Sequence, residues 1–60
     1  MWIIKDMMMV NTDQCYMIAV DEAGRTVAYT DYEKFTISTT NILGQILSAI
    51  RNKQLFMEVK

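Results

Sequence analysis

The side chains that could do chemistry are few in this chain of 60 residues. It has no histidine, which removes the commonest general base and the commonest metal ligand. Its only cysteine, Cys15, has uncharged sequence neighbours, whereas a reactive thiolate needs electropositive surroundings. We therefore interpret Cys15 as a buried structural thiol in the middle of a strand.

The acidic residues occur in two close pairs, Asp21 with Glu22 and Asp31 with Glu33. A catalytic pair of carboxylates needs an enclosed pocket that raises the pKa of one member, and a small domain has little volume for such a pocket. A calcium loop needs a richer alternation of acids than either pair supplies. We therefore interpret both pairs as solvated turn residues.

The sequence also contains no glycine-rich loop of the kind that binds phosphate groups. Its two glycines, Gly24 and Gly44, lie too far apart for a dinucleotide-binding or phosphate-binding loop. Together with the missing histidine, this predicts a protein that is not an enzyme. We expect no catalytic residue, no cofactor and no metal.

Length and composition place the chain among small folded proteins. We expect residues 1–60 to form a single domain, of which about 60% of the unfolded surface is buried on folding. Apolar residues make up 52% of the chain and charged residues 22%, as in ordinary globular proteins. Scaffolds of this size usually need a disulfide, a metal or a partner chain, and a lone cysteine cannot form an internal disulfide. The stability must therefore come from close packing, oligomerisation or docking on another protein.

The formal net charge of −1 lacks the basic excess of a nucleic-acid binder. The charge is uneven, because residues 1–33 carry two bases and six acids, whereas residues 34–60 carry four bases and one acid. Acidic turns and a basic helix end would produce this pattern, and a surface that steers a partner is the alternative. The candidate basic contacts are Arg51 and Lys53. They leave a nucleic-acid-associated regulator as a second alternative, although the composition disfavours nucleic acid as a partner.

The first ten residues do not resemble a secretory signal, because they lack a basic beginning and charges interrupt the apolar run. The chain has no stretch of about 18 apolar residues, so we expect no contact with a membrane. A lone free cysteine suits a reducing compartment. These features together predict a cytoplasmic protein.

The predicted elements begin with three strands over residues 2–10, 14–20 and 25–30, which we expect to form an antiparallel meander. Asp21 to Gly24 ends on glycine after three polar or small residues, which is typical of a hairpin connection. Residues 31–38 could form a short strand or an ordered loop.

A helix is expected next, and its candidate N-terminal caps are Thr39, Thr40 and Asn41. Apolar residues then recur at three- and four-residue spacing, and Asn52 is a plausible C-terminal cap. Gly44 costs about 1 kcal/mol relative to alanine inside a helix, so we expect it to permit a close helix–sheet approach. Alternation over residues 54–59 predicts a last strand. The expected fold is α+β: a small antiparallel sheet, β-β-β-α-β, with one helix packed on one face.

One helix cannot cover both faces of a sheet, and the uncovered face is the main indication of an interface. The consecutive methionines Met7, Met8 and Met9 place apolar surface on both sides of the first strand, as core filling or as partner contact. The candidate partner interface consists of Trp2, Ile4, Met8, Tyr16 and Tyr29, because tryptophan and tyrosine dominate interface energetics.

Size and expected architecture resemble the small one-domain regulators and inhibitors that phages and other mobile elements encode, although no motif carries over. The sequence therefore predicts a small protein-interaction module that acts as a regulator or inhibitor of a partner protein. The alternative is an obligate homo-oligomeric structural or scaffold subunit, in which a homodimer forms through the two-sided apolar strand at residues 2–10.

Overall fold

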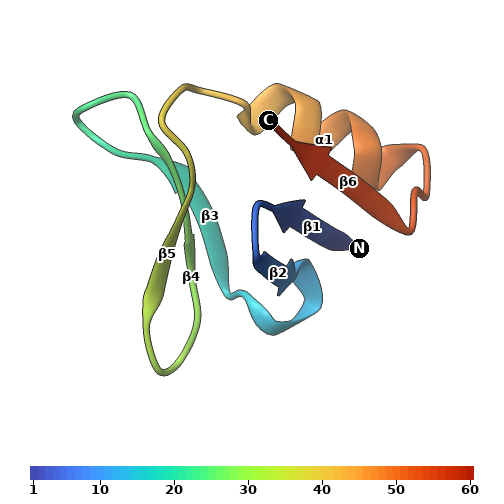
Figure 1. Ribbon diagram of the computed structural model, residues 1–60, viewed down its shortest axis with the longest axis horizontal. Helices are drawn as coiled ribbons and strands as arrows, with labels where there is room; N and C mark the ends of the chain where they lie inside the picture. Colours follow the sequence, from blue (N-terminus) through green and yellow to red (C-terminus); the bar gives the residue numbers. More distant parts are fainter.

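The computed structural model describes residues 1–60 as two three-stranded sheets and one helix (Figure 1). In chain order the elements are β1 (Trp2–Lys5), β2 (Met8–Asn11), a 3₁₀ turn (Thr12–Gln14), β3 (Met17–Val20), β4 (Thr26–Tyr29), β5 (Lys34–Ser38), α1 (Leu43–Arg51) and β6 (Phe56–Val59). The helix approaches β3 as well as the first sheet. The predicted α+β class, with a helix packed on strands, is therefore confirmed.

The first sheet has the strand order β2-β1-β6. β1 and β2 form an antiparallel hairpin, and β6 pairs with β1 in parallel. Parallel neighbours need a long crossover connection. Here that connection contains the whole second sheet and α1, so the last strand returns to lie beside the first (Figure 1).

The single strand predicted for residues 2–10 is wrong, because the chain reverses at Asp6 and Met7. Asp6 adopts a φ of 50°, the left-handed region that aspartate tolerates better than most residues. The reversal places Ile3 opposite Val10, and both are buried on the inner side of the sheet. The apolar residues on both sides of Lys5 and Asp6 concealed this turn, since no glycine or proline marks it.

The second sheet is an antiparallel meander with the order β3-β4-β5. The meander predicted over residues 2–10, 14–20 and 25–30 is therefore wrong in its first strand: residues 2–10 take no part in it, and β5, within residues 31–38, supplies its third strand. The ladder between β4 and β5 is irregular next to Thr26 and Val27.

The hairpin connection predicted between Asp21 and Gly24 is confirmed. Gly24 has a φ of 81°, and its N–H donates to the Asp21 carbonyl over 3.0 Å. The Asp21 carboxylate accepts from the backbone N–H groups of Ala23 and Arg25 and pairs with the Arg25 guanidinium at 2.9 Å. The hydrogen bond from the Arg25 backbone is the largest cause that holds the pKa of Asp21 below its ordinary value.

The helix begins at Leu43, later than the predicted caps at Thr39 to Asn41. Asn41 still contributes, since its Oδ1 accepts from the Leu43 N–H over 3.1 Å. The predicted C-terminal cap at Asn52 is confirmed. Beyond it, Lys53 takes a left-handed φ of 57°, the place that glycine usually fills when a helix ends in this way.

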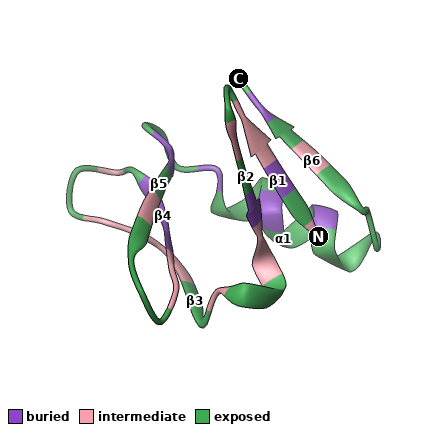
Figure 2. Ribbon diagram, turned by 60° about the horizontal axis from the view of Figure 1, so that its bottom comes forward, coloured by how far each residue is buried: buried purple, intermediate pink, exposed green.

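One hydrophobic cluster joins both sheets and the helix. Its buried members are Ile3 of β1, Val10 of β2, Ala28 of β4, Ile37 of β5, Ile42 and Ile46 at α1, and Val59 of β6. Figure 2 shows buried segments in both sheets and in α1. The first sheet therefore turns one face to the core, while its other face has no layer of secondary structure over it.

Thr26 connects the second sheet to the start of the helix. Its side chain is 0% exposed, and its hydroxyl donates to the Thr40 carbonyl over 2.8 Å. The same oxygen accepts from the Ile42 N–H over 3.0 Å. No buried side-chain nitrogen or oxygen lacks a partner, so this connection leaves no polar side-chain atom unpaired in the core.

Replacing Thr26 by valine keeps the shape of the side chain but removes both hydrogen bonds. The buried Ile42 N–H then has no acceptor, so we expect the free energy of unfolding to fall by about 2–4 kcal/mol in urea titrations. A domain of this length has roughly 3–9 kcal/mol in total. Thr26→Ser is the matched control, because it keeps the hydroxyl. Equal stability of the two variants would refute the role assigned to this oxygen.

Candidate functional site

Cys15 lies between the 3₁₀ turn and β3, where it packs against the core at partial exposure. Its thiol donates to the Asn11 carbonyl over 3.5 Å. Burial raises the pKa of the Cys15 thiol, because the thiolate would lose solvation there. These surroundings disfavour the reactive thiolate, although Cys15 is only partly buried and stands just before the strand in which it was predicted.

The acidic residues do not converge. Asp31 and Glu33 are exposed in the connection between β4 and β5, and Glu22 is exposed in the turn after β3. No group of three Cys, Asp or Glu side chains comes close enough together to hold a metal ion. The chemistry-bearing side chains therefore stay at separate places on the fold.

The outer face of the first sheet carries several exposed apolar side chains, with Asn11 and Glu58 on the same side at its margins. Successive residues of a strand point to opposite sides, so Trp2 and Ile4 point away from the core that holds Ile3. Ile4 pairs with Met9 across β2, and Trp2 pairs with Phe56 across β6. The exposed fractions are 40% for Trp2, 55% for Met9 and 58% for Phe56. We call the surface of Trp2, Ile4, Met9 and Phe56 the outer face.

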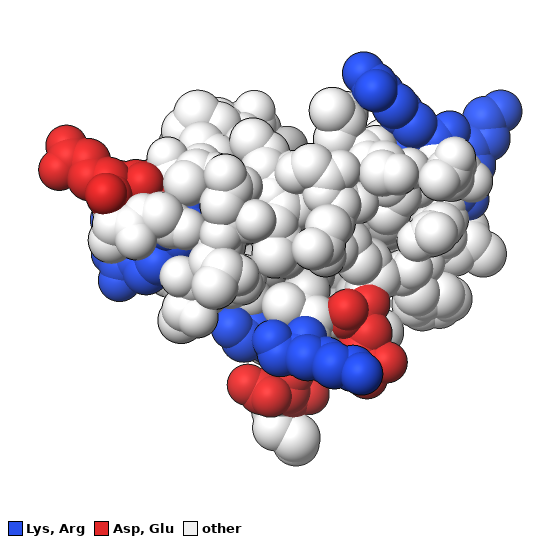
Figure 3. Space-filling view, turned by 90° about the horizontal axis from the view of Figure 1, so that it is seen from above, with Lys and Arg blue, Asp and Glu red and all other residues white.

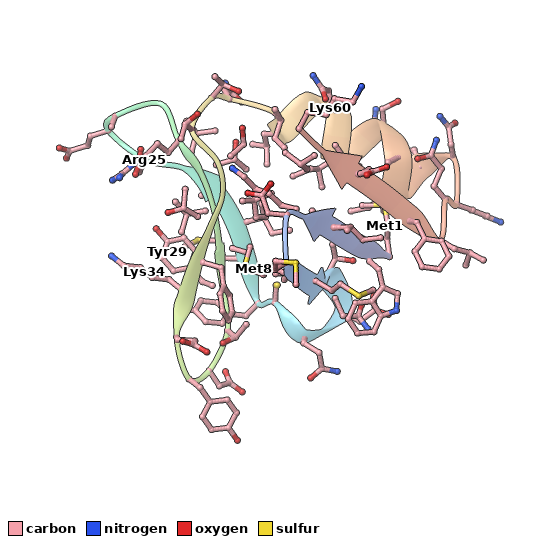
Figure 4. All side chains as sticks on the ribbon, viewed as in Figure 1. Met1, Met8, Arg25, Tyr29, Lys34 and Lys60 are labelled. Carbon is pink, nitrogen blue, oxygen red and sulfur yellow. The ribbon has the colours of Figure 1, made fainter.

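The structure divides the five residues predicted for the partner interface. Trp2 and Ile4 belong to the outer face, whereas Met8 points inward and packs partly buried against the core. Tyr29 ends β4 and Tyr16 stands just before β3, both at the second sheet, where their ring centroids lie 6.3 Å apart in a tilted arrangement. Figure 4 shows Met8 on β2 and Tyr29 on β4, in different sheets.

Sequence reasoning missed Met9 and Phe56 as members of the outer face. Alternation in the last strand correctly separated Phe56 and Glu58 from Met57 and Val59. What placed Phe56 beside Trp2 was the parallel register of β1 with β6, which no local pattern reveals. Met9 was missed because the turn at residues 6 and 7 reverses the alternation assumed for one long strand.

The candidate basic contacts Arg51 and Lys53 are both exposed at the end of α1. On the face drawn in Figure 3, Lys and Arg side chains form separate groups around a broad uncharged surface, and one group has acidic side chains beside it. That face carries no continuous basic surface, so it does not offer the row of Lys and Arg contacts that a nucleic-acid phosphate backbone needs.

A shallow open groove of about 590 Å³ lies between α1 and β6. On the helix side it is lined by small and polar residues, including Gly44 and Ser48, and Met57 and Glu58 line the strand side. The prediction that Gly44 permits a close helix–sheet approach is wrong, since a Cβ there would meet nothing within 4 Å. Gly44 instead leaves one wall of the groove without a side chain.

Comparison with protein families, with curated proteins and with solved structures finds no match for this chain. The helix α1 is too short to cross a membrane. The functional argument therefore rests on the outer face and the groove themselves.

The raised pKa of Cys15 predicts slow alkylation. Less thiolate is present at pH 7 in the folded chain than in the urea-unfolded chain, so we expect iodoacetamide to react several-fold more slowly with the folded protein. Mass spectrometry of quenched time points measures both rates, with free cysteine in each buffer as the control. A folded rate equal to the unfolded rate would show that burial does not suppress this thiol.

Proposed function

We propose that this chain is a non-enzymatic protein-interaction module that regulates or inhibits a partner protein by binding it through the outer face. The observation that carries the proposal is the exposure of Trp2, Met9 and Phe56 together on one side of a sheet whose other side forms the core. Contiguous exposed apolar surface commonly marks protein-binding sites, and tryptophan is enriched among the residues that dominate binding energy.

The form of this surface favours a protein partner over a small molecule. A ligand pocket encloses most of its ligand, whereas the outer face is the open side of a three-stranded sheet. The side chains are also adaptable, since Met9 is unbranched and can adjust to the surface it meets. A regulator of this kind acts by occupying a surface of its partner, so it needs no chemistry of its own.

The experiment places a photo-reactive amino acid at Met9 of the outer face and, separately, at Tyr32. Tyr32 is 96% exposed in the connection between β4 and β5 and serves as the matched control. Both proteins are irradiated in nuclease-treated lysate of the source cell, and the adducts are identified by mass spectrometry. We expect one protein to crosslink from position 9 and not from position 32.

The partner identified in this way is then purified and its affinity is measured. Trp2→Ala should raise the dissociation constant by about 30-fold, corresponding to a loss of about 2 kcal/mol at a central aromatic contact. Tyr32→Ala should leave the constant unchanged, and circular dichroism verifies that both variants fold. Crosslinking from position 32 alone, or binding that is indifferent to Trp2→Ala, would refute the proposed surface.

A further inference from the structure

The free side of β6 is a hydrogen-bonding edge beside a groove. β6 ends the first sheet, and its only strand neighbour is β1. The Trp2 N–H donates to the Leu55 carbonyl over 2.8 Å. Backbone groups alternate between the two sides of a strand, so Met57 and Val59 also bond toward β1. Phe56 and Glu58 therefore direct their N–H and C=O groups away from the sheet, and neither residue takes part in the backbone hydrogen bonds outside the regular elements.

The other sheet edges are less suited to pairing. β5 begins with Lys34 and belongs to a ladder with an irregular register, and both a lysine and a bulge discourage edge pairing. β3 lies close to α1. β2 leads directly into the 3₁₀ turn, which the Asn11 side chain fixes by accepting from the Asp13 N–H. β6 contains no proline and no bulge, and it alone borders the groove.

We propose that two copies of this chain pair antiparallel along β6 about a two-fold axis and so form one six-stranded sheet. Closed two-fold dimers are the commonest protein oligomers, and their interfaces must be self-complementary. An edge that offers both donors and acceptors at Phe56 and Glu58 meets that condition. The pairing is separate from the partner binding proposed above and does not depend on it.

Charge excludes one register of the pairing. If Glu58 lay on the axis, the two Glu58 carboxylates would stand directly opposite each other, which destabilises a strand pair. If Met57 lies on the axis, Phe56 bonds with Glu58 of the second copy and Glu58 bonds with Phe56 of the second copy. The outward-pointing groups of both residues then find partners without opposing like charges.

The groove accommodates this arrangement. Opposite residues of paired strands lie on the same side of a sheet, so Met57 of the second copy points inward as Met57 does here. The second Met57 therefore lies over the helix side of the groove, where the lining residues Gly44, Ser48 and Ala49 are small. Methionine is flexible and adapts readily to such an irregular space. On the other side of the sheet, each Phe56 lies opposite Glu58 of the second copy, so the two outer faces adjoin across a border that contains both kinds of side chain.

The small core gives a reason for association. Only 11 of the 60 residues are buried, and domains of this size commonly gain stability from a second chain. Binding of the folded chain to another copy shifts the folding equilibrium toward the folded state.

The test removes a single outward N–H. A chain made by chemical synthesis carries an N-methyl group on the backbone nitrogen of Glu58, and its control carries one on Met9. The Met9 N–H also points out of an edge strand, as the bond from the Thr12 N–H to the Met1 carbonyl and the register of β1 with β2 indicate. We expect sedimentation equilibrium to show a dimer for the unmodified chain and for the Met9 control. For the Glu58 form we expect a dissociation constant at least about tenfold higher.

A monomer for the unmodified chain at about 1 mM, or equal dissociation by the two methylated chains, would overturn the proposal. Two substitutions test it without a change to the backbone. Phe56→Lys and Phe56→Glu lose the same ring, but only the lysine lies opposite a favourable charge at Glu58 of the second copy. Phe56→Lys should therefore dimerise more tightly than Phe56→Glu, and the reverse order would overturn the register. A negative result here leaves the crosslinking test at Met9 untouched.

Discussion

The arrangement of the whole chain depends on one buried hydroxyl, that of Thr26. It holds the segment before the helix by donating to the Thr40 carbonyl and accepting from the Ile42 N–H. Ile42 and Ile46 are thereby brought into the same cluster as the inner residues of both sheets. A small sheet must bury its hydrophobic face against another element, and the helix that this hydroxyl positions gives the two sheets a common core.

Because the common core lies on one side of the first sheet, its other side stays uncovered. The fold has a single helix, and that helix is used on the inner side, where Ile3, Val10 and Val59 are buried. Trp2, Met9 and Phe56 therefore stay in solvent, although a chain of 60 residues would gain stability by burying them. For the same reason no further strand pairs with the free side of β6, which remains an edge of the sheet. Both surfaces follow from how little secondary structure this chain has to cover its sheets.

Local chemistry explains which parts of the fold could be predicted from the sequence. The connection from Asp21 to Gly24 was predictable because a glycine with positive φ and an aspartate that accepts neighbouring N–H groups act within a few residues. The helix was predictable from its spacing of apolar residues, but its start was shifted because Thr26, distant in sequence, fixes Ile42. The hairpin at Asp6 was not predictable, because an apolar pattern on both sides of the turn resembles one longer strand.

The candidate surface was predictable only in part, because strand pairing between distant segments decides which residues share it. Trp2 and Ile4 were found from residue type and alternation, whereas Met9 and Phe56 join them through pairings of distant segments. Tyr16 and Tyr29 were grouped with them because the sequence suggested one sheet where the chain forms two. Strand register, more than residue type, determines which exposed apolar residues share a face.

The most direct measurement of the central claim, that the first sheet is buried on one face and open on the other, uses Trp2 as the only tryptophan. Acrylamide quenching of its fluorescence reports solvent access to the outer face in the dilute folded protein, with the urea-unfolded chain as the reference. With 40% of its surface exposed, Trp2 should quench with a substantial fraction of the unfolded-state constant and emit at a red-shifted wavelength. A blue-shifted emission that resists acrylamide in the dilute folded monomer would contradict the account, because it would place Trp2 in the core.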